Sequence, residues 1–299
     1  MQTIGILLAF GMALCWAGSG IALQRPSQRM DVFVVSGTRA LSGFVFLLPI
    51  IFILGLAHQV QRLSPSQWLY VIGSIVVGGM IGDVCYVLGL RFIGMSRSFP
   101  IINSYPLFTI FYTAILLGRR IQVQNVIGAL LVLAGVYCIA RSSWSRGVSI
   151  VERDRDRQSS ALLGVAMALS AAAAYGLEAI LISLGVGDVN GIVANAVRVP
   201  VMILFAFSVA GARGALREHR GIDLSTLASV ALAGLLGWAL AGSMWVTSIQ
   251  IIGPSQAAII GSTSPLFAVP LSVLILHERP TRWTLVGTFL AVAGVILVI

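Results

Sequence analysis

Four ionisable side chains lie inside long apolar stretches of the sequence: Arg39, Asp83, Glu178 and Arg198. An ionisable group within a bilayer costs about 2.5 to 3.5 kcal/mol on insertion scales, so each of the four is a candidate functional residue. The two arginines lie near enough to the ends of their stretches for their long side chains to reach the membrane surface. The two carboxylates are shorter. We interpret them either as groups that take up a proton during function, because low dielectric favours a neutral carboxyl, or as ion-pair partners of the arginines.

Aromatic side chains recur at matched positions along the chain. An offset of 159 residues carries Trp16 onto Tyr175 and Tyr86 onto Trp245, and Trp238 precedes Trp245 by about two helical turns. Residues at that spacing lie broadly on one face of a helix. We hypothesise that these five aromatic residues line a central cavity. The alternative is that they pack in the core or face lipid.

The composition indicates the environment in which these residues function. Of the 299 residues, 58% are hydrophobic and 10% are charged, and the mean hydropathy is +0.98. Soluble domains are roughly a quarter charged, so a soluble globular protein is excluded. The net charge of +9 comes from arginines that lie mostly between the apolar stretches. That arrangement is typical of membrane topology signals, and we expect no nucleic-acid partner.

The apolar stretches set the fold class. A transmembrane helix needs about 20 mostly apolar residues, and the sequence contains ten such stretches. We therefore expect an all-α membrane protein with ten transmembrane helices embedded in a lipid bilayer. The expected spans are 3–23, 33–57, 67–90, 98–118, 123–140, 161–183, 191–211, 224–249, 256–276 and 283–299.

The two halves of the chain align without a gap at the same offset of 159 residues. The tripeptide Pro106-Leu107-Phe108 falls on Pro265-Leu266-Phe267, and Arg39 falls on Arg198 within an apolar stretch. Helix packing can place small residues in step, but it does not explain two intramembrane arginines in register. Duplication of a five-helix unit is the economical explanation.

Each repeat holds an odd number of spans, so the second repeat must begin on the opposite side of the membrane from the first. Such inverted repeats are typical of secondary transporters, in which substrate binds near the midplane and access alternates. Because one chain supplies both repeats, we expect a monomer to be sufficient for function. The expected units are a first five-helix repeat at 1–141, a charged linker at 142–160 and a second five-helix repeat at 161–299.

Short polar runs precede Pro106 and Pro265 in the fourth and ninth expected spans. A proline inside a helix removes a backbone donor and frees the carbonyl four residues earlier. Loosened, polar helix segments are the best sequence pointer to the binding site of an inverted-repeat transporter. The predicted substrate contacts in these runs are Asn103, Ser104, Tyr105, Ser262, Thr263 and Ser264.

The distribution of arginines predicts the orientation. The odd-numbered loops between spans hold 14 arginines, whereas the even-numbered loops hold only Arg62, Arg119 and Arg120. Positive charges in short loops mark the cytoplasmic side. The odd loops are therefore expected in the cytoplasm, and both chain termini are expected outside.

The paired units around the two prolines resemble the EamA-like repeats of the drug/metabolite transporter superfamily, and the resemblance covers nearly the whole chain. In the second repeat it rests on Ser264-Pro265-Leu266-Phe267, Glu278-Arg279-Pro280 and Ala293-Gly294-Val295. Arg39 and Arg198 match an arginine often found early in the second helix of each family unit.

The first repeat departs from the family pattern, because Arg119 occupies the position that matches Glu278. The resemblance implies ten helices, a central cavity and transport of a small metabolite, such as an amino acid or a related compound, across the cell (inner) membrane. It also implies coupling to an ion or exchange gradient, with protons as a candidate ion. Many family members are thought to keep both termini in the cytoplasm, contrary to the arginine count above.

Two other functional classes compete with transport. An intramembrane enzyme acting on a lipid-linked substrate normally clusters His, Asp or Glu at one interface, and this sequence shows no such cluster. A passive channel would differ by a flux that does not depend on a gradient. The three histidines have no metal-ligand spacing, and a chain without lysine cannot contain a phosphate-binding GxxxxGK loop. We therefore expect a non-enzymatic transporter with no cofactor and no metal.

Overall fold

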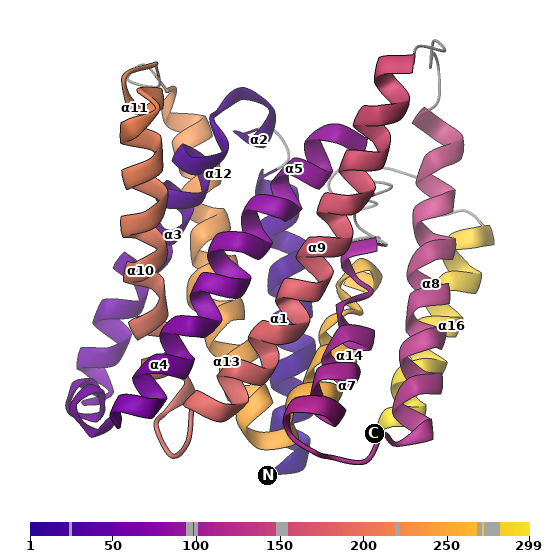
Figure 1. Cartoon of the computed structure of the whole chain (residues 1–299), viewed down its shortest axis with the longest axis horizontal. Coiled ribbons are helices and arrows are strands. Elements are labelled where there is room, and N and C mark those ends of the chain that lie inside the picture. The colour runs from indigo at the N-terminus through magenta and orange to yellow at the C-terminus, as the bar shows by residue number, and fades with distance from the viewer. Residues whose placement is uncertain are drawn as a thin grey trace.

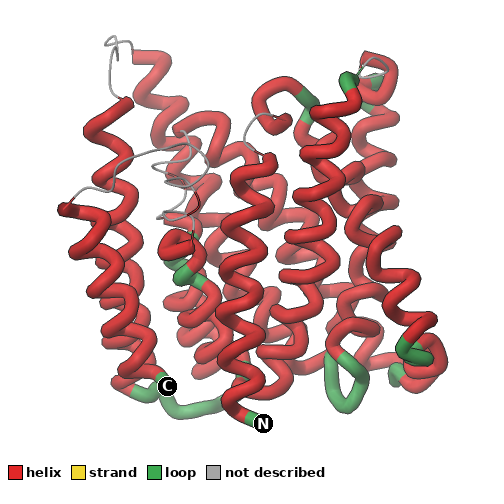
Figure 2. The backbone as a smooth tube through the Cα atoms, turned by 180° about the vertical axis from the view of Figure 1, so that it is seen from behind, coloured by secondary structure: helices red, strands yellow, loops and turns green. Residues whose placement is uncertain are grey.

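The computed structural model describes residues 1–23, 26–93, 98, 101–147, 155–218, 222–267, 271 and 282–299, and this part of the chain is helical without a strand. The long helices stand side by side, and both chain termini lie at the same edge of the bundle (Figure 1, Figure 2). The elements are α1 (Gln2–Leu23), α2 (Pro26–Arg29), α3 (Val32–Ile53), η1 (Ala57–Arg62), α4 (Pro65–Ser74), η2 (Ile75–Gly82), α5 (Asp83–Ile93), α7 (Tyr105–Leu116), α8 (Val123–Gly147), α9 (Arg155–Gly185), α10 (Gly191–Ala212), α11 (Ala215–Glu218), α12 (Leu224–Gly234), η3 (Leu235–Ala241), α13 (Gly242–Ile252), α14 (Pro254–Gly261) and α16 (Arg282–Val298).

Six helices in the described residues are long and apolar enough to cross a membrane: Gln2–Leu23, Val32–Ile53, Pro65–Gly89, Leu162–Gly185, Gly191–Ala212 and Leu224–Ile252. Three shorter apolar helices accompany them, at Tyr105–Leu116, Val123–Cys138 and Leu285–Val298. The expected spans 98–118 and 256–276 each include residues outside the described ranges. The architecture is that of a helical, multi-pass membrane protein.

The outer surface of the bundle suits contact with lipid. Large apolar side chains project from it, such as those of Ile53 and Phe289, which are 82% and 74% exposed. Side chains of this kind are mostly buried in soluble proteins. Small residues such as Ala9 and Ala172 are fully buried between the helices, where they allow close approach of neighbouring backbones.

The expected linker at 142–160 is partly helical. Helix α8 continues to Gly147 and helix α9 begins at Arg155, while residues 148–154 lie outside the described ranges. Extending an existing helix requires no new nucleus, and arginine and glutamine are good helix formers. The polar composition of the segment therefore did not predict where α8 ends and where α9 begins.

Equivalent positions in the two halves form equivalent local structures. Asp31 caps α3 and Asn190 caps α10, each by accepting the amide hydrogen two residues further on at 2.9 Å. Ser64 caps α4 and Asp223 caps α12, each by accepting the amide hydrogen three residues further on. Both pairs of caps are separated by the offset of 159 residues, so the repeat extends to the hydrogen bonds that begin the helices.

Helix packing repeats with the two halves exchanged. Gly128 of α8 packs on Gly294 of α16, and Gly135 of α8 packs on Gly287 of α16. The offset carries the first contact onto the second with the partners swapped. A Cβ atom on Gly128 would lie 2.7 Å from the carbonyl oxygen of Gly294, so only glycine allows these backbones to meet. Figures 1 and 2 show α8 and α16 together at one end of the bundle.

Two π-helical segments interrupt long helices at related places. Segment η2 (Ile75–Gly82) joins α4 to α5, and segment η3 (Leu235–Ala241) joins α12 to α13. The expected spans at 67–90 and 224–249 did not anticipate this change of winding. A π-helical turn disturbs the regular hydrogen-bond ladder and is frequent at functional sites.

The glycine contact between α8 and α16 leads to a stability prediction. We expect Gly128→Val to destabilise the protein by about 1 to 3 kcal/mol, because the added side chain overlaps Val298 and the backbone of Gly294. Thermal unfolding of the detergent-purified protein measures the effect. The matched control is Leu130→Val on the exposed side of the same helix. Equal unfolding temperatures for the two variants would contradict the packing described here.

Candidate functional site

A cavity of about 150 Å³ lies among helices from both halves of the chain, including α1, α3, α9, α10 and both π-helical segments. Twelve of the fifteen residues singled out in the sequence line it. They are Trp16, Arg39, Asp83, Tyr86, Asn103, Tyr105, Tyr175, Glu178, Arg198, Trp238, Trp245 and Ser264. Positions that are distant in sequence and chemically unusual in apolar stretches are therefore brought together at one place.

Ser104, Ser262 and Thr263 are not among the residues that line the cavity. Each hydroxyl instead donates a hydrogen bond to the backbone carbonyl three residues earlier, at 2.6 to 2.8 Å. Serine and threonine hydroxyls often donate to a nearby backbone carbonyl in this way near helix ends. The polar runs before the prolines thus contribute only part of their side chains to the cavity.

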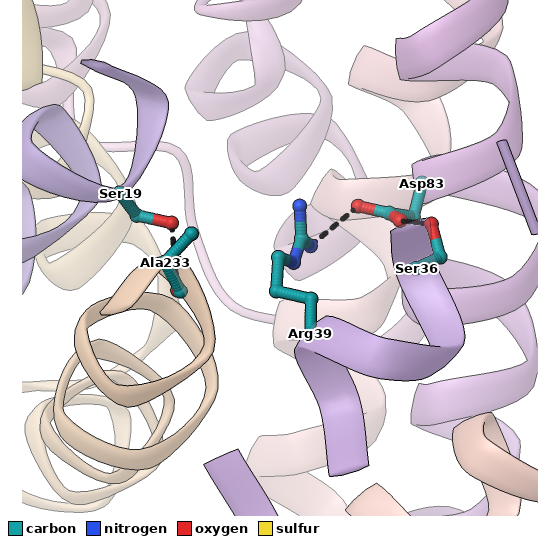
Figure 3. A network of polar contacts seen from close by, with 5 residues as sticks. All are labelled: Ser19, Ser36, Arg39, Asp83 and Ala233. Atoms are coloured by element: carbon teal, nitrogen blue, oxygen red, sulfur yellow. Dashed lines mark hydrogen bonds and ion pairs between the residues drawn. The ribbon is translucent and has the colours of Figure 1, made fainter. Parts of the chain in front are cut away.

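The first half of the chain contributes a buried ion pair. The Nη2 atom of Arg39 in α3 donates to Oδ1 of Asp83 in α5 at 2.9 Å. Ser36, one turn before Arg39, donates from Oγ to Oδ2 of the same carboxylate at 2.8 Å. Figure 3 shows both side chains pointing at Asp83, with Ser19 of α1 donating to the Ala233 carbonyl oxygen nearby at 2.9 Å. Both carboxylate oxygens of Asp83 are therefore hydrogen-bonded.

The second half contributes a second pair, between Arg198 of α10 and Glu178 of α9. Arg198 is 2% exposed and Glu178 is 9% exposed. The Glu178 carboxylate rests against Gly78 of η2, where a Cβ atom would overlap it. The interpretation that Arg39 and Arg198 extend to the membrane surface is therefore wrong, because both guanidinium groups turn inward to carboxylates.

Aromatic rings close the cavity from both halves. The centroids of Trp16 and Trp245 are 6.3 Å apart, and Tyr105 meets Trp245 edge-on at 6.1 Å. The Arg39 guanidinium carbon lies 5.6 Å from the ring centroid of Trp238, a cation–π contact. The aromatic contacts connect the two halves, whereas each ion pair lies within one half.

Sequence reasoning missed three polar residues of the site: Ser19, Ser36 and Asn195. Asn195 lines the cavity and donates from Nδ2 to the Trp238 carbonyl oxygen at 2.7 Å. The repeat offset was a usable signal, because it carries Ser36 onto Asn195 and Ser19 onto Glu178. Single serines and asparagines in apolar stretches are otherwise too common to stand out.

No cluster of three or more His, Cys, Asp or Glu side chains in the described part of the chain is placed to hold a metal ion. The motif at 278–280, which contributed to the family resemblance, lies outside the described ranges. The chemistry that this cavity offers is that of paired charges, hydrogen-bond donors and aromatic rings.

Comparison with known proteins decides the family. The sequence profile of the EamA-like transporter family matches residues 3–141 and again residues 162–299. The chain belongs to the EamA-like transporter family. An uncharacterized transporter of Archaeoglobus fulgidus is 23% identical to it over 98% of this chain and 97% of the relative. The uncharacterized transporter YoaV of Bacillus subtilis is 22% identical over 96% of this chain and 93% of the relative.

This EamA-like protein is also similar to a bacterial inner membrane protein in sequence and to a protein of known structure in fold. The uncharacterized inner membrane transporter YhbE of Escherichia coli K12 is 23% identical over 47% of this chain and 44% of the relative. A protein of known crystal structure shares the fold with a TM-score of 0.74, at 18% identity, over 99% of this chain and 96% of that one. The family and the names of its relatives point to a membrane transporter.

The ion pairs lead to a prediction about stability. We expect Asp83→Asn to destabilise the protein by about 3 to 5 kcal/mol, because it leaves the Arg39 charge buried without its carboxylate. The double variant Arg39→Gln/Asp83→Asn should recover a large part of this loss, since it removes both charges. Thermal unfolding in detergent measures both, with Asp188→Asn in an exposed turn as the matched control. Additive losses in the double variant would contradict a coupled buried pair.

Proposed function

We propose that this EamA-like protein is a secondary active transporter that moves a small metabolite by alternating access. The metabolite is an amino acid or a related compound, and its movement is coupled to an ion or exchange gradient, with protons as the candidate ion. The observation that carries the proposal is the central cavity, which combines two buried ion pairs with aromatic rings from both halves of the chain. The protein provides no catalytic chemistry in this scheme.

The proposed architecture is ten transmembrane helices in two inverted repeats, 1–141 and 161–299, joined through 142–160. The exchanged glycine contacts of α8 and α16 and the matched helix caps support it. The position of both termini at one edge supports an even number of crossings (Figure 1). A monomer is sufficient in this arrangement, because one chain encloses the cavity.

The location of the contacts suggests how access alternates. Each ion pair lies within one repeat, so a rocking movement between repeats leaves both pairs intact. The ring contacts of Trp245 with Trp16 and Tyr105 lie between repeats and must change as the cavity opens. In this scheme the paired charges stay together within each repeat while the aromatic contacts rearrange.

Transport itself is tested in proteoliposomes. We expect uptake of at least one member of a panel of amino acids and related metabolites, with a rate that depends on an imposed pH gradient. Trp245→Ala should lower that rate by about tenfold, as loss of a buried aromatic contact commonly does. Trp283→Ala is the matched control, because Trp283 lies on α16, which does not line the cavity.

Three results would count against the transporter. Absence of flux for the whole panel would contradict transport of this substrate class. Flux that ignores every gradient would favour a passive channel. A chemically altered lipid-linked compound in the liposomes would favour an intramembrane enzyme.

We propose that the protein lies in the cell inner membrane with both termini outside. The edge that carries the termini also carries the loop with Arg119 and Arg120, whereas α2 and α11 lie at the opposite edge (Figure 1). Epitope tags on each terminus should be detected in spheroplasts without permeabilisation. Detection only after permeabilisation would place the termini in the cytoplasm, as the family resemblance implies, and would overturn the arginine count.

A further inference from the structure

The cavity is lined by hydrogen-bond donors that have no partner in the described part of the chain. The buried Nε atoms of Arg39 and Arg198 and the buried Nε1 atoms of Trp238 and Trp245 lack an acceptor. The hydroxyl of Tyr105 is also buried without a partner. All five residues border the same cavity. Arginine and tryptophan nitrogens can only donate, so the site is complementary to a ligand rich in acceptor oxygens.

One buried acceptor of the cavity also lacks a partner, the Oδ1 atom of Asn195. The unpartnered groups of the cavity are therefore four that can only donate, one amide oxygen that can only accept, and one tyrosine hydroxyl that can donate or accept. Buried donors without acceptors cost free energy, and this cost is relieved when a ligand supplies acceptors. A carboxylate supplies about four acceptor positions and no donor, which fits this imbalance better than an amine.

The two ion pairs differ in how firmly their carboxylates are held. Asp83 accepts from Arg39 and also from Ser36. Among the hydrogen bonds of the described residues, Glu178 accepts only from Arg198. The residue equivalent to Ser36 is Asn195, and its Nδ2 donates to the Trp238 carbonyl oxygen and the Ser243 hydroxyl instead. Glu178 is therefore the carboxylate that can be exchanged.

We propose that the transported metabolite carries a carboxylate that replaces Glu178 on Arg198, while Glu178 takes up one proton from solution. This inference rests on the transport function proposed above. The proton binds a carboxylate oxygen of Glu178 as its bond to the guanidinium breaks, and it returns to solution when the ligand leaves and the ion pair forms again. One negative charge and one proton thus enter together, and the net charge of the cavity does not change.

The proton is required because an ionised Glu178 would lose its only charge partner. Glu178 is 9% exposed, and its carboxylate already lies against Gly78 of η2, where a Cβ atom would overlap it. The other ionisable groups that act on it are Asp83 of α5 and Tyr105 of α7, with Tyr175 on its own helix and Arg198 on α10. Asp83 repels a second negative charge nearby, and neither tyrosine supplies a cation. Among the described residues, Arg198 is thus the cation that pairs with Glu178 and for which the ligand competes.

Binding of three matched probes to the purified full chain tests the inference. Phenylacetate, phenylacetamide and phenethylamine share a ring and short chain but are negative, neutral and positive near pH 7. Calorimetric titration in two buffers of different ionisation enthalpy gives the protons taken up per ligand bound. We expect binding of phenylacetate in preference to the other two, with about one proton taken up. Linkage then weakens its apparent Kd about tenfold for each pH unit at alkaline pH.

Glu178→Gln separates coupling from binding. This variant should bind phenylacetate with no proton uptake and with a Kd that no longer changes between pH 6 and 8. Ser183→Ala is the matched control on the same helix, because its hydroxyl donates only to the Ile180 carbonyl oxygen and does not line the cavity. It should take up the proton as the wild type does. The wild-type proton count needs no variant, so it remains decisive if Glu178→Gln does not fold.

Several outcomes would overturn the inference. They are absence of phenylacetate binding at every pH, binding without proton uptake, equal affinity for phenylacetamide, and proton uptake that persists in Glu178→Gln. The result is separable from the proposed function. Proton-linked binding without flux in proteoliposomes would reject transport and keep the carboxylate site. Flux of a neutral or cationic metabolite without proton-linked phenylacetate binding would keep transport and reject the carboxylate exchange.

Discussion

A charge that is buried inside a membrane protein must have a partner, and this constraint organises the structure. Two arginines and two carboxylates occupy the centre of the bundle, and each arginine has one carboxylate within reach. Pairing requires α3 to present Arg39 toward α5 and α10 to present Arg198 toward α9. It also requires space beside the carboxylates, which Gly78 provides for Glu178. Much of the helix arrangement around the cavity therefore follows from the need to keep four charges together in low dielectric.

The division of contacts between and within the halves has a mechanical consequence. Each buried ion pair joins residues of one half, whereas ring contacts, small residues and single hydrogen bonds such as that of Ser19 to Ala233 cross between the halves. Ring contacts are worth little per contact and tolerate sliding, so they can be exchanged at small cost. Buried ion pairs cannot, because separation leaves an uncompensated charge. The ring contacts can therefore change without separating either ion pair.

The sequence predicted the kind of protein and the chemically important positions better than it predicted their orientation. Hydropathy identified the apolar helices and all four ionisable residues inside them, because a charge stands out in an apolar stretch. The offset of 159 residues added the match of Arg39 with Arg198. Ion pairing with the carboxylates stayed one of two alternatives for Arg39 and Arg198, since pairing depends on helix rotation about neighbours. The same limit explains why Ser262 and Thr263 were predicted to contact the substrate but do not line the cavity. Their hydroxyls donate to carbonyl groups of their own helix backbone. π-helical winding likewise depends on packing and leaves no composition signature.

The exceptions to the internal repeat are as informative as the repeat itself. The offset carries Asp83 onto Gly242 and Glu178 onto Ser19. The residue equivalent to each carboxylate in the other half is therefore small and uncharged. A fully symmetric cavity with all equivalents acidic would place four carboxylates near two arginines, and their mutual repulsion would leave two negative charges uncompensated. One carboxylate from each half, in contrast, balances the two arginines. The halves thereby become chemically unequal, and the pair held by fewer hydrogen bonds, Arg198 with Glu178, is the one free to change partner.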